Sequence, residues 1–159
     1  MGKYLFGGPA AFRSAVGDLL VGAVRDAYAA GAEQAPDVLD LYCGVGVFGL
    51  ACLAAKKGAG RLVGVESGRS AVASAKRNAA ALGVEANFFC ERVGGSIHRL
   101  NAGPTKTVIV DPPRGGFEPG VADWLAKAPA PRILCVSCDP ATLGRDLGVL
   151  LKSYEIVRA

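Results

Sequence analysis

The sequence lacks the features of membrane-spanning and secreted proteins. No apolar run approaches the roughly 20 residues that cross a bilayer. The N-terminal segment, MGKYLFGGPAAF, contains no signal-peptide core. Five cysteines are an odd number, and in a chain without a secretion signal they favour free thiols in a reducing compartment. We therefore expect a cytoplasmic protein that does not enter membranes.

Histidine is almost absent, which argues against a metal centre. His98 is the only histidine, and Cys135 and Cys138 form the only C-x-x-C pair, so the donors of a tetrahedral zinc site are missing. Charge is also sparse: charged residues make up 20% of the sequence, and the formal net charge is +4. This mildly basic balance is compatible with nucleic acid and is weak evidence for it.

Hydrophobic residues, in contrast, are plentiful. They make up 51% of the 159 residues, enough for one domain with a substantial core. We expect a single domain over residues 1–159, in which residues 1–36 form a lead-in segment and a helix. From there on, short apolar runs typical of strands alternate with helical segments. This order predicts an α/β fold with a doubly wound, mainly parallel sheet.

The expected elements place polar residues at one edge of that sheet. Strands are expected at residues 38–42, 61–66, 86–90, 107–110, 132–136 and 154–157. Helices are expected at residues 12–30, 47–57, 70–82, 118–127 and 140–151, with 92–105 irregular. Ligands of open α/β sheets bind outside the carboxyl ends of the strands. Four polar or reactive residues at strand ends should therefore converge there: Asp40, Glu66, Asp111 and Cys138.

Residues 38–50, VLDLYCGVGVFGL, predict a strand, a glycine turn and the start of a helix. Gly44 and Gly46 let the backbone approach a ligand closely, and the helix N-terminus offers free N–H groups. The G-x-G-x-x-G spacing also fits a dinucleotide, but Asp40 would repel a pyrophosphate. Asp40 suits a cationic ligand with an amino group, such as S-adenosylmethionine. Glu66 is placed to bind a ribose diol in either case. An ordinary strand-to-helix turn is the third alternative.

Residues 111–116, DPPRGG, follow the expected fourth strand. Prolines cannot extend a strand ladder, so the chain must turn out at the ligand edge. Asp111 could then hydrogen-bond a substrate ring, and Arg114 could contact a phosphate. The alternative is a rigid surface turn with solvated charges.

Residues 136–143, VSCDPATL, place Cys138 between a strand end and a helix start. A helix N-terminus stabilises a thiolate, although Asp139 opposes this effect if its charge points the same way. We interpret the other cysteines as small core residues, because a free cysteine is most often buried. They are Cys43, Cys52, Cys90 and Cys135. Cys138 alone is then expected at the reactive edge.

Four segments, in this order and spacing, resemble the RNA uracil-5-methyltransferase family. They are DLYCGVGVFGL, GVESGRSAVASAKRNAAALG, DPPRGG and VSCDPATLGRDL. The resemblance covers about residues 37–152, and its last two motifs are specific. Members methylate C5 of uridine in transfer or ribosomal RNA. The resemblance therefore implies a class I methyltransferase fold of Rossmann-like type, S-adenosylmethionine as cofactor and RNA as partner.

The same resemblance implies roles for individual residues. Cys138 matches the nucleophile that adds to C6 of the uracil, and Asp111 matches the acid beside the target base. Arg114 is the expected substrate contact, and Asn78 matches a family position without a firm role. Six residues are expected at the cofactor: Asp40, Tyr42, Gly44, Gly46, Glu66 and Asp111.

The sequence also departs from the family pattern. Arg13 and Ala15 stand where the family usually has Gln and Asn, and Asp139 replaces the more common Asn. Family members have N-terminal RNA-binding regions, and they continue into a further strand and a His-x-Glu segment whose Glu removes the C5 proton. We therefore expect a sheet without its last strand and impaired turnover by residues 1–159 alone.

Two other functions compete with this one. A non-catalytic domain that binds S-adenosylmethionine or a partner would explain Arg13 and the missing segment. In that case an open sheet edge could mediate self-association. An NAD-dependent oxidoreductase is supported only by the glycine spacing and Glu66, and it gives the two downstream motifs no role.

Overall fold

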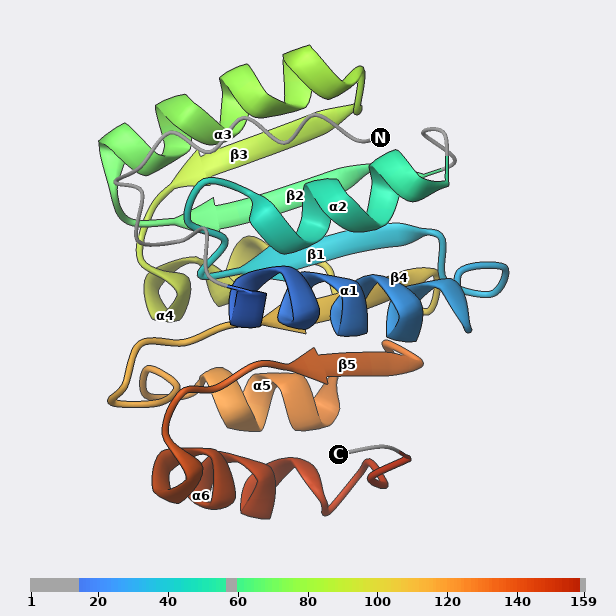
Figure 1. Cartoon of the computed structure of the whole chain (residues 1–159). Coiled ribbons are helices and arrows are strands. Elements are labelled where there is room, and N and C mark those ends of the chain that lie inside the picture. The colour runs from blue at the N-terminus through green and yellow to red at the C-terminus, as the bar shows by residue number, and fades with distance from the viewer. Residues whose placement is uncertain (1–14, 57–59, 158–159) are drawn as a thin grey trace.

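The protein is a five-stranded sheet flanked by helices, as the computed structural model shows for residues 15–56 and 60–157 (Figure 1). All neighbouring strands are parallel, in the order β3-β2-β1-β4-β5. Their bounds are β1 Asp37–Leu41, β2 Leu62–Glu66, β3 Ala86–Cys90, β4 Lys106–Val110 and β5 Arg132–Cys135. The carboxyl ends of the strands lie on the left in Figure 1.

Helices cover both faces of the sheet. The first three cover one face and pack side by side: α1 Ala15–Ala29, α2 Val47–Ala55 and α3 Arg69–Leu82. The short α4 Val93–Ser96, the 3-10 turn η2 Ile97–Arg99 and α5 Val121–Lys127 contribute to the core of the other face. The last helix, α6 Pro140–Leu150, packs against α5. The predicted doubly wound α/β fold is therefore confirmed.

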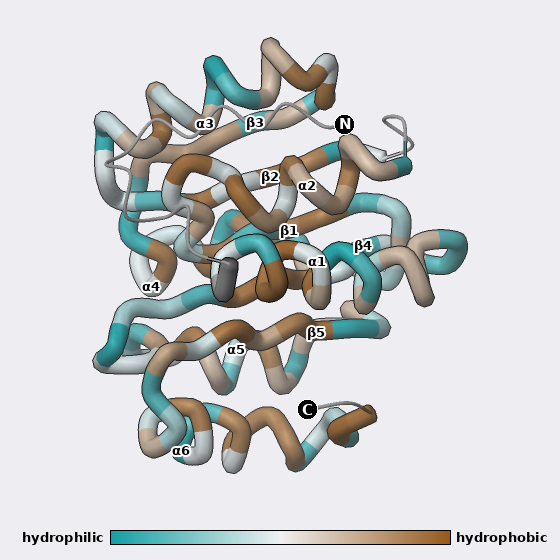
Figure 2. Tube along the Cα trace, viewed as in Figure 1, coloured by the Kyte–Doolittle hydropathy of each residue, from teal (hydrophilic) through white to brown (hydrophobic). Residues whose placement is uncertain are grey.

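Two hydrophobic cores form because the central strands are buried on both faces. In β1, Val38 packs with Val24 and Tyr28 of α1, whereas the adjacent Leu39 packs with Leu125 of α5. Val38 and Leu39 are each only 1% exposed. Successive side chains of a strand point to opposite faces, so a strand covered on both sides needs a continuous apolar run. Figure 2 shows the apolar residues gathered along the strands.

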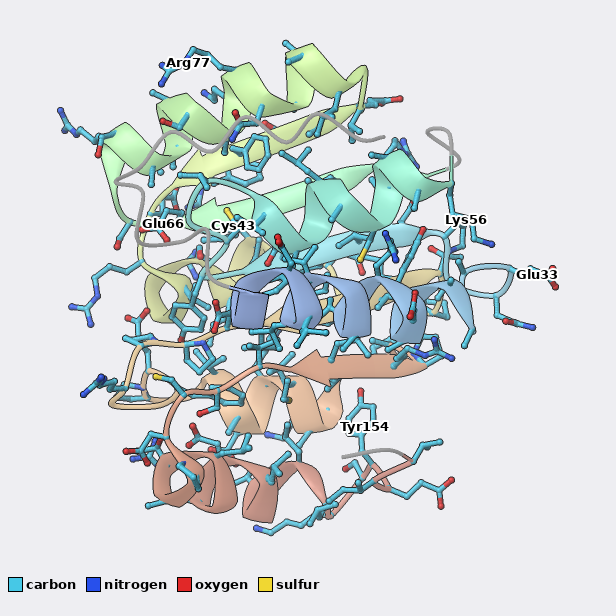
Figure 3. The ribbon with its side chains drawn as sticks, in the orientation of Figure 1. Glu33, Cys43, Lys56, Glu66, Arg77 and Tyr154 are labelled. Atoms are coloured by element: carbon cyan, nitrogen blue, oxygen red, sulfur yellow. The ribbon has the colours of Figure 1, made fainter. Side chains whose placement is uncertain are left out.

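The prediction of a strand at residues 154–157 is wrong. Among the described residues, 154–157 form no strand, and β5 is an outer strand of the sheet. Instead, the hydroxyl of Tyr154 donates to the carbonyl oxygens of Ala128 (2.9 Å) and Ala130 (3.1 Å), as its position in Figure 3 illustrates. The apolar residues of this segment are compatible with a strand, but Tyr154 hydrogen-bonds the segment to the loop that joins α5 to β5 instead.

Helix boundaries differ in smaller ways. The helix expected at residues 70–82 begins one residue earlier, at Arg69, and its N-cap is Gly68. The expected helix at 118–127 begins at Val121, and the irregular stretch 92–105 contains α4 and η2. The expected helical residues 12–14, including Arg13, lie outside the described part of the chain. Within that part, no helix is both long enough and apolar enough to cross a membrane.

Gly49 allows α2 to lie close to the sheet, and we expect Gly49→Ala to destabilise the fold. An added Cβ would be 2.6 Å from Cδ1 of Leu62 and 2.9 Å from Oδ2 of Asp40, both fully buried side chains. Overpacking of this kind costs about 1–3 kcal/mol of unfolding free energy. Gly22→Ala is the control, because its Cβ would meet nothing within 4 Å in α1. That variant should gain about 0.5–1 kcal/mol. Urea unfolding distinguishes the two, and equal effects would contradict the packing argument.

Candidate functional site

The residues expected to converge do come from neighbouring strands at one edge. Asp40 lies near the end of β1, and Glu66 ends β2. Asp111 directly follows β4, and Cys138 follows β5 by three positions. Because β2, β1, β4 and β5 are consecutive parallel strands, these residues all belong to the carboxyl edge of the sheet.

The turn between β1 and α2 has an unusual backbone. Gly44 and Gly46 have φ values of 53° and 84°, in the left-handed region that favours glycine. Tyr42 has φ 61° and is the only described non-glycine residue with positive φ. A left-handed backbone costs a non-glycine residue of this kind roughly 1–3 kcal/mol, and such residues cluster at functional sites. The predicted cofactor turn is thus the strained part of the described chain.

Asp40 is a buried carboxyl group with one free acceptor. Its side chain is 0% exposed, and its Oδ2 accepts the N–H of Gly49 at 3.0 Å. Its Oδ1 has no hydrogen-bond partner within the described residues. Burial raises the pKa of Asp40 to about 7, and the charges of Asp111 and Glu66 add to the rise, which the Gly49 bond opposes. This oxygen can therefore hold a proton or accept from a ligand donor.

Glu66 connects β2 to the glycine turn. Its Oε2 accepts the N–H of Gly44 at 3.1 Å, and its Oε1 accepts the N–H of Gly68 at 2.6 Å and the hydroxyl of Ser67 at 3.3 Å. Figure 3 shows Glu66 and Cys43 together near the start of α2. A carboxylate has about four lone-pair positions, so these three bonds leave room for a ligand hydroxyl. Glu66 thus both shapes the turn and can still bind a ribose.

Asn78 has a clearer role than the sequence alone indicates. Its side-chain Nδ2, on α3, donates to the carbonyl oxygen of Val45 at 3.1 Å. Val45 lies between the two glycines of the turn, so the bond ties α3 to the predicted cofactor loop. The partner is 33 positions away in the sequence, which explains why spacing patterns do not reveal it.

The DPPRGG segment forms a tight turn after β4. The N–H of Gly116 donates to the carbonyl oxygen of Pro113 at 2.8 Å, which places Arg114 and Gly115 at the tip. Arg114 is exposed, as a phosphate contact requires. Asp111 is half-buried, and burial raises its pKa to about 6. A carboxyl group with this pKa can donate or accept a hydrogen bond near neutral pH.

Cys138 is exposed just before α6. Asp139 is the N-cap of that helix, and its Oδ1 accepts the N–H groups of Ala141 and Thr142, each at 2.9 Å. These bonds hold the pKa of Asp139 below its usual value. Pro140 occupies the first turn, as the sequence predicts. The carboxylate therefore satisfies the helix end beside the thiol.

The expectation for the other cysteines is partly wrong. Cys43 and Cys52 are buried and Cys135 is half-buried, but Cys90 is exposed at the end of β3. It lines a surface hollow of about 450 Å³ with Arg69, Val72, Ala73 and Lys76. β3 is an outer strand, so its end is covered on one side only. Two exposed cysteines, Cys90 and Cys138, therefore lie at opposite ends of the same edge.

Sequence reasoning missed the residues that hold the DPPRGG segment in place. The hydroxyl of Tyr42 accepts the N–H of Glu118 at 3.1 Å, and the carboxylate of Glu118 pairs with Arg92 at 2.9 Å. On the other side, Asp146 of α6 accepts the N–H of Phe117 at 2.8 Å.

The sequence does contain one indication that Asp146 is buried and paired. This residue lies on the apolar stripe of α6 formed by Leu143, Leu147 and Leu150, and a charge on such a stripe indicates a buried partner.

The described residues contain no group of three or more histidine, cysteine or acidic side chains that could hold a metal ion.

Comparison with known proteins identifies two families. Residues 18–120 match the methyltransferase small domain, and residues 92–159 match the tRNA (uracil-5-)-methyltransferases.

Three curated relatives are named as methyltransferases of RNA. An uncharacterized RNA methyltransferase of Nitratidesulfovibrio vulgaris is 38% identical over 139 residues, which cover 82% of this chain and 28% of the relative. An uncharacterized RNA methyltransferase of Clostridium acetobutylicum is 41% identical over 121 residues, which cover 75% of this chain and 26% of the relative. The 23S rRNA (uracil(1939)-C(5))-methyltransferase RlmD of Acinetobacter baumannii is 38% identical over 135 residues, covering 80% and 28%. The chain thus spans about a quarter of the length of these relatives.

Solved structures share the fold. TrmN of Thermus thermophilus has a TM-score of 0.61 at 17% identity, over 86% of this chain and 43% of TrmN. A putative RNA methyltransferase of Pyrococcus horikoshii has a TM-score of 0.59 at 18% identity, over 89% of this chain and 71% of that one. Because the match to the methyltransferase small domain covers more than half of the chain, the chain belongs to that family, and residues 92–159 are similar to the tRNA (uracil-5-)-methyltransferases.

Proposed function

We propose that this protein binds S-adenosylmethionine and transfers its methyl group to C5 of a uridine in transfer or ribosomal RNA. The observation that carries the proposal is the arrangement of the carboxyl edge. Asp40 lies in β1, which leads into the glycine turn, and Glu66 ends β2 on one side of β1. On the other side β4 leads to Asp111, and the exposed Cys138 follows β5, the next strand.

The residues at the edge suit the cofactor. Glu66 would hold the ribose diol with its remaining lone pairs, and Oδ1 of Asp40 is a buried acceptor that would face positive charge. Gly44 and Gly46 would allow the close backbone approach, and Tyr42 belongs to the same turn. Bound S-adenosylmethionine supplies a methyl group on a positively charged sulfur. The methyltransferase BpumL, of the same fold with a TM-score of 0.53, was crystallised with the corresponding product, SAH.

Cys138 is the proposed nucleophile. Its sulfur would form a bond to C6 of the uracil, and the electron pair of the C5–C6 double bond would move towards the C4 carbonyl to give an enolate. C5 then becomes the carbon that takes the methyl group. A base would then take the C5 proton, the electrons of the C5–H bond would form the C5–C6 double bond again, and the sulfur of Cys138 would leave C6 as a thiolate. The exposure of Cys138 in the segment between β5 and α6 is what such an attack requires.

Asp111 and Arg114 would hold the RNA. With its raised pKa, Asp111 can bond to a ring N–H or carbonyl oxygen of the uracil, and it also lies close enough to Asp40 to affect that residue. Arg114 at the exposed tip of the turn would contact a phosphate. RlmD, whose name gives a uracil C5 of 23S rRNA as its target, is the similar protein that favours ribosomal RNA.

A non-catalytic domain is the second candidate. The observation that favours it is the engagement of Glu66 by backbone N–H groups, which gives this residue a structural role without any ligand. Such a domain could self-associate through the outer edge of β3 or β5. We also propose a cytoplasmic location for either function, because all five cysteines are free.

Covalent trapping tests the proposed reaction. RNA transcripts that contain 5-fluorouridine have no C5 proton to lose, so the bond between Cys138 and C6 should persist once the methyl group is on C5. We expect a denaturation-resistant protein–RNA adduct that requires S-adenosylmethionine, visible by gel and by intact mass. An adduct that forms equally well without the cofactor, or none with transfer or 23S ribosomal RNA transcripts, would contradict the proposal.

A further inference from the structure

Asp146 is a buried acidic residue whose hydrogen bonds hold the DPPRGG segment and the residue after it in place. Its side chain on α6 is 8% exposed. Oδ2 accepts the N–H of Phe117 at 2.8 Å, and Oδ1 accepts two N–H groups of Arg145, at 2.9 and 2.8 Å. Arg145 also donates to the carbonyl oxygen of Gly115 at 3.0 Å. The two side chains therefore bind the backbone on both sides of Gly116.

Gly116 shows how closely the segment fits this pair. It has φ 80°, and an added Cβ would be 2.1 Å from an Arg145 nitrogen and 2.5 Å from Oδ2 of Asp146. No side chain can occupy that position without moving the ion pair. The closeness leaves the turn from Pro113 to Gly116 little freedom to shift along α6.

The pair also connects two motifs that the sequence keeps apart. Arg145 and Asp146 belong to α6, which begins two residues after Cys138, whereas Arg114 is at the tip of the turn they bind. The next residue after Phe117, Glu118, donates its N–H to the hydroxyl of Tyr42 in the cofactor turn. The segment is thus fixed from both sides, by the nucleophile helix and by the glycine turn.

We propose that Asp146, supported by Arg145, is a positioning residue that fixes the spacing between the Arg114 turn and Cys138. A nucleophile must attack C6 while the base and its phosphate are held by the turn, and misplacement by about 1 Å can cost roughly 100-fold in rate. Asp146 supplies this spacing through the backbone of residues 115–117 and does not itself touch the substrate. That Asp146 fixes this spacing follows from the contacts above, whereas the catalytic purpose of the spacing rests on the proposed function.

Crosslinking measures the spacing without RNA or cofactor. Arg114→Cys, in a Cys90→Ser background, is treated with bifunctional maleimides of increasing length, and crosslinks to Cys138 are quantified by peptide mass spectrometry. We expect one preferred length when Asp146 is intact. Asp146→Ala should spread the crosslinks over several lengths, with about a fivefold loss at the preferred one. The same spread with Asp123→Ala, an exposed acid on α5, or an unchanged profile with Asp146→Ala, would overturn the inference.

Two further variants separate positioning from folding. Arg145→Ala removes the bond to Gly115 but leaves the bond from Phe117 to Asp146, so it should broaden the profile less. Asp146→Asn keeps an oxygen for Phe117 and should restore most of the preferred length. Melting temperatures are recorded for each, and a profile that follows the melting temperature across the set would overturn the inference in favour of general destabilisation.

Adduct formation then links the spacing to the reaction. In the chain with Arg114 intact, Asp146→Ala should slow the trapping of 5-fluorouridine RNA at saturating RNA by about 10–100-fold. Its affinity for S-adenosylmethionine should stay within about twofold, because the hydrogen bonds of Asp146 go to Phe117 and Arg145, neither of which is an expected cofactor residue. If the unaltered chain forms no adduct, the proposed function fails while the crosslinking still decides the spacing. Slowing that appears only as weaker cofactor affinity would overturn the positioning role.

Discussion

Cys138→Ala is expected to abolish the covalent adduct with 5-fluorouridine RNA, whereas Cys90→Ala should leave its yield unchanged. Both thiols are exposed, and both lie at the carboxyl edge of the sheet. They differ in their positions: Cys138 lies between β5, the strand next to the one that leads to the DPPRGG turn, and the start of α6, whereas Cys90 ends β3 at the far side of the sheet. Exposure alone therefore cannot account for a difference between the two variants.

The size of the expected loss follows from covalent catalysis. Without the sulfur at C6, C5 of the uracil is not an enolate carbon and has little tendency to take a methyl group. Removing a nucleophile of this kind typically costs about 10⁴–10⁶ in rate, so no adduct should be detectable. Binding of S-adenosylmethionine should not change, because Asp40 and Glu66 lie in β1 and β2 and the two glycines lie in the turn after β1, all on other segments than Cys138. Retained adduct in Cys138→Ala, or its loss in Cys90→Ala, would show that another thiol reacts.

Asp40→Asn is expected to stabilise the fold at neutral pH and to weaken cofactor binding. Asp40 has a pKa of about 7 in the folded protein, against an unperturbed value near 3.8. Between these values the folded protein holds a proton that the unfolded chain has lost. Stability therefore falls as pH rises through this window, by up to about 4 kcal/mol in total at about 1.4 kcal/mol per pH unit.

Asparagine removes this titration with little change of shape. Its oxygen can still accept the N–H of Gly49, and it cannot ionise. The difference in unfolding free energy between variant and unaltered protein should grow from about pH 4 to about pH 7 and then level off. Urea unfolding at several pH values measures it, and taking the difference cancels the contribution of Asp111, which is raised in the same direction. A difference independent of pH would show that Asp40 is not a buried titrating group.

The same substitution should weaken binding of S-adenosylmethionine. A hydrogen bond to a charged group is worth about 1.5–3 kcal/mol, which corresponds to roughly 10–150-fold in affinity. Higher stability together with weaker binding is the signature of a group kept for function at a cost in stability. A stabilised variant that binds the cofactor unchanged would assign Asp40 a purely structural role.

The sheet was predictable from the sequence because its signals are local. Buried parallel strands read as apolar runs, and all five appear within one or two residues of the expected bounds. Gly83 ends α3 with φ 65°, as a glycine after a helix should. The shared edge followed from topology, since consecutive parallel strands end on the same side. Local pattern plus chain order is therefore enough to bring Asp40, Glu66, Asp111 and Cys138 to one region.

The contacts that hold the site were not predictable, because they join segments distant in the chain. The hydroxyl of Tyr42 accepts a hydrogen bond from the N–H of Glu118, which is 76 positions away in the sequence. The carboxylate of Asp146 accepts one from the N–H of Phe117, which is 29 positions away. Periodicity carries no information on such pairs. The exposure of Cys90 depends on the outer position of β3 in the sheet. The absence of the strand expected at residues 154–157 depends on the hydrogen bond of Tyr154 to the loop before β5. Each miss is a tertiary contact that overrides a local pattern.

The most direct test of the account is calorimetric titration of the purified protein with S-adenosylmethionine, with NAD as the control ligand. Both contain a ribose that Glu66 could bind, but only NAD carries the pyrophosphate that Asp40 should repel. We predict one binding site for S-adenosylmethionine and no heat of binding with NAD. Binding of NAD alone, or of neither ligand, would contradict the assignment of the glycine turn to a methyl donor.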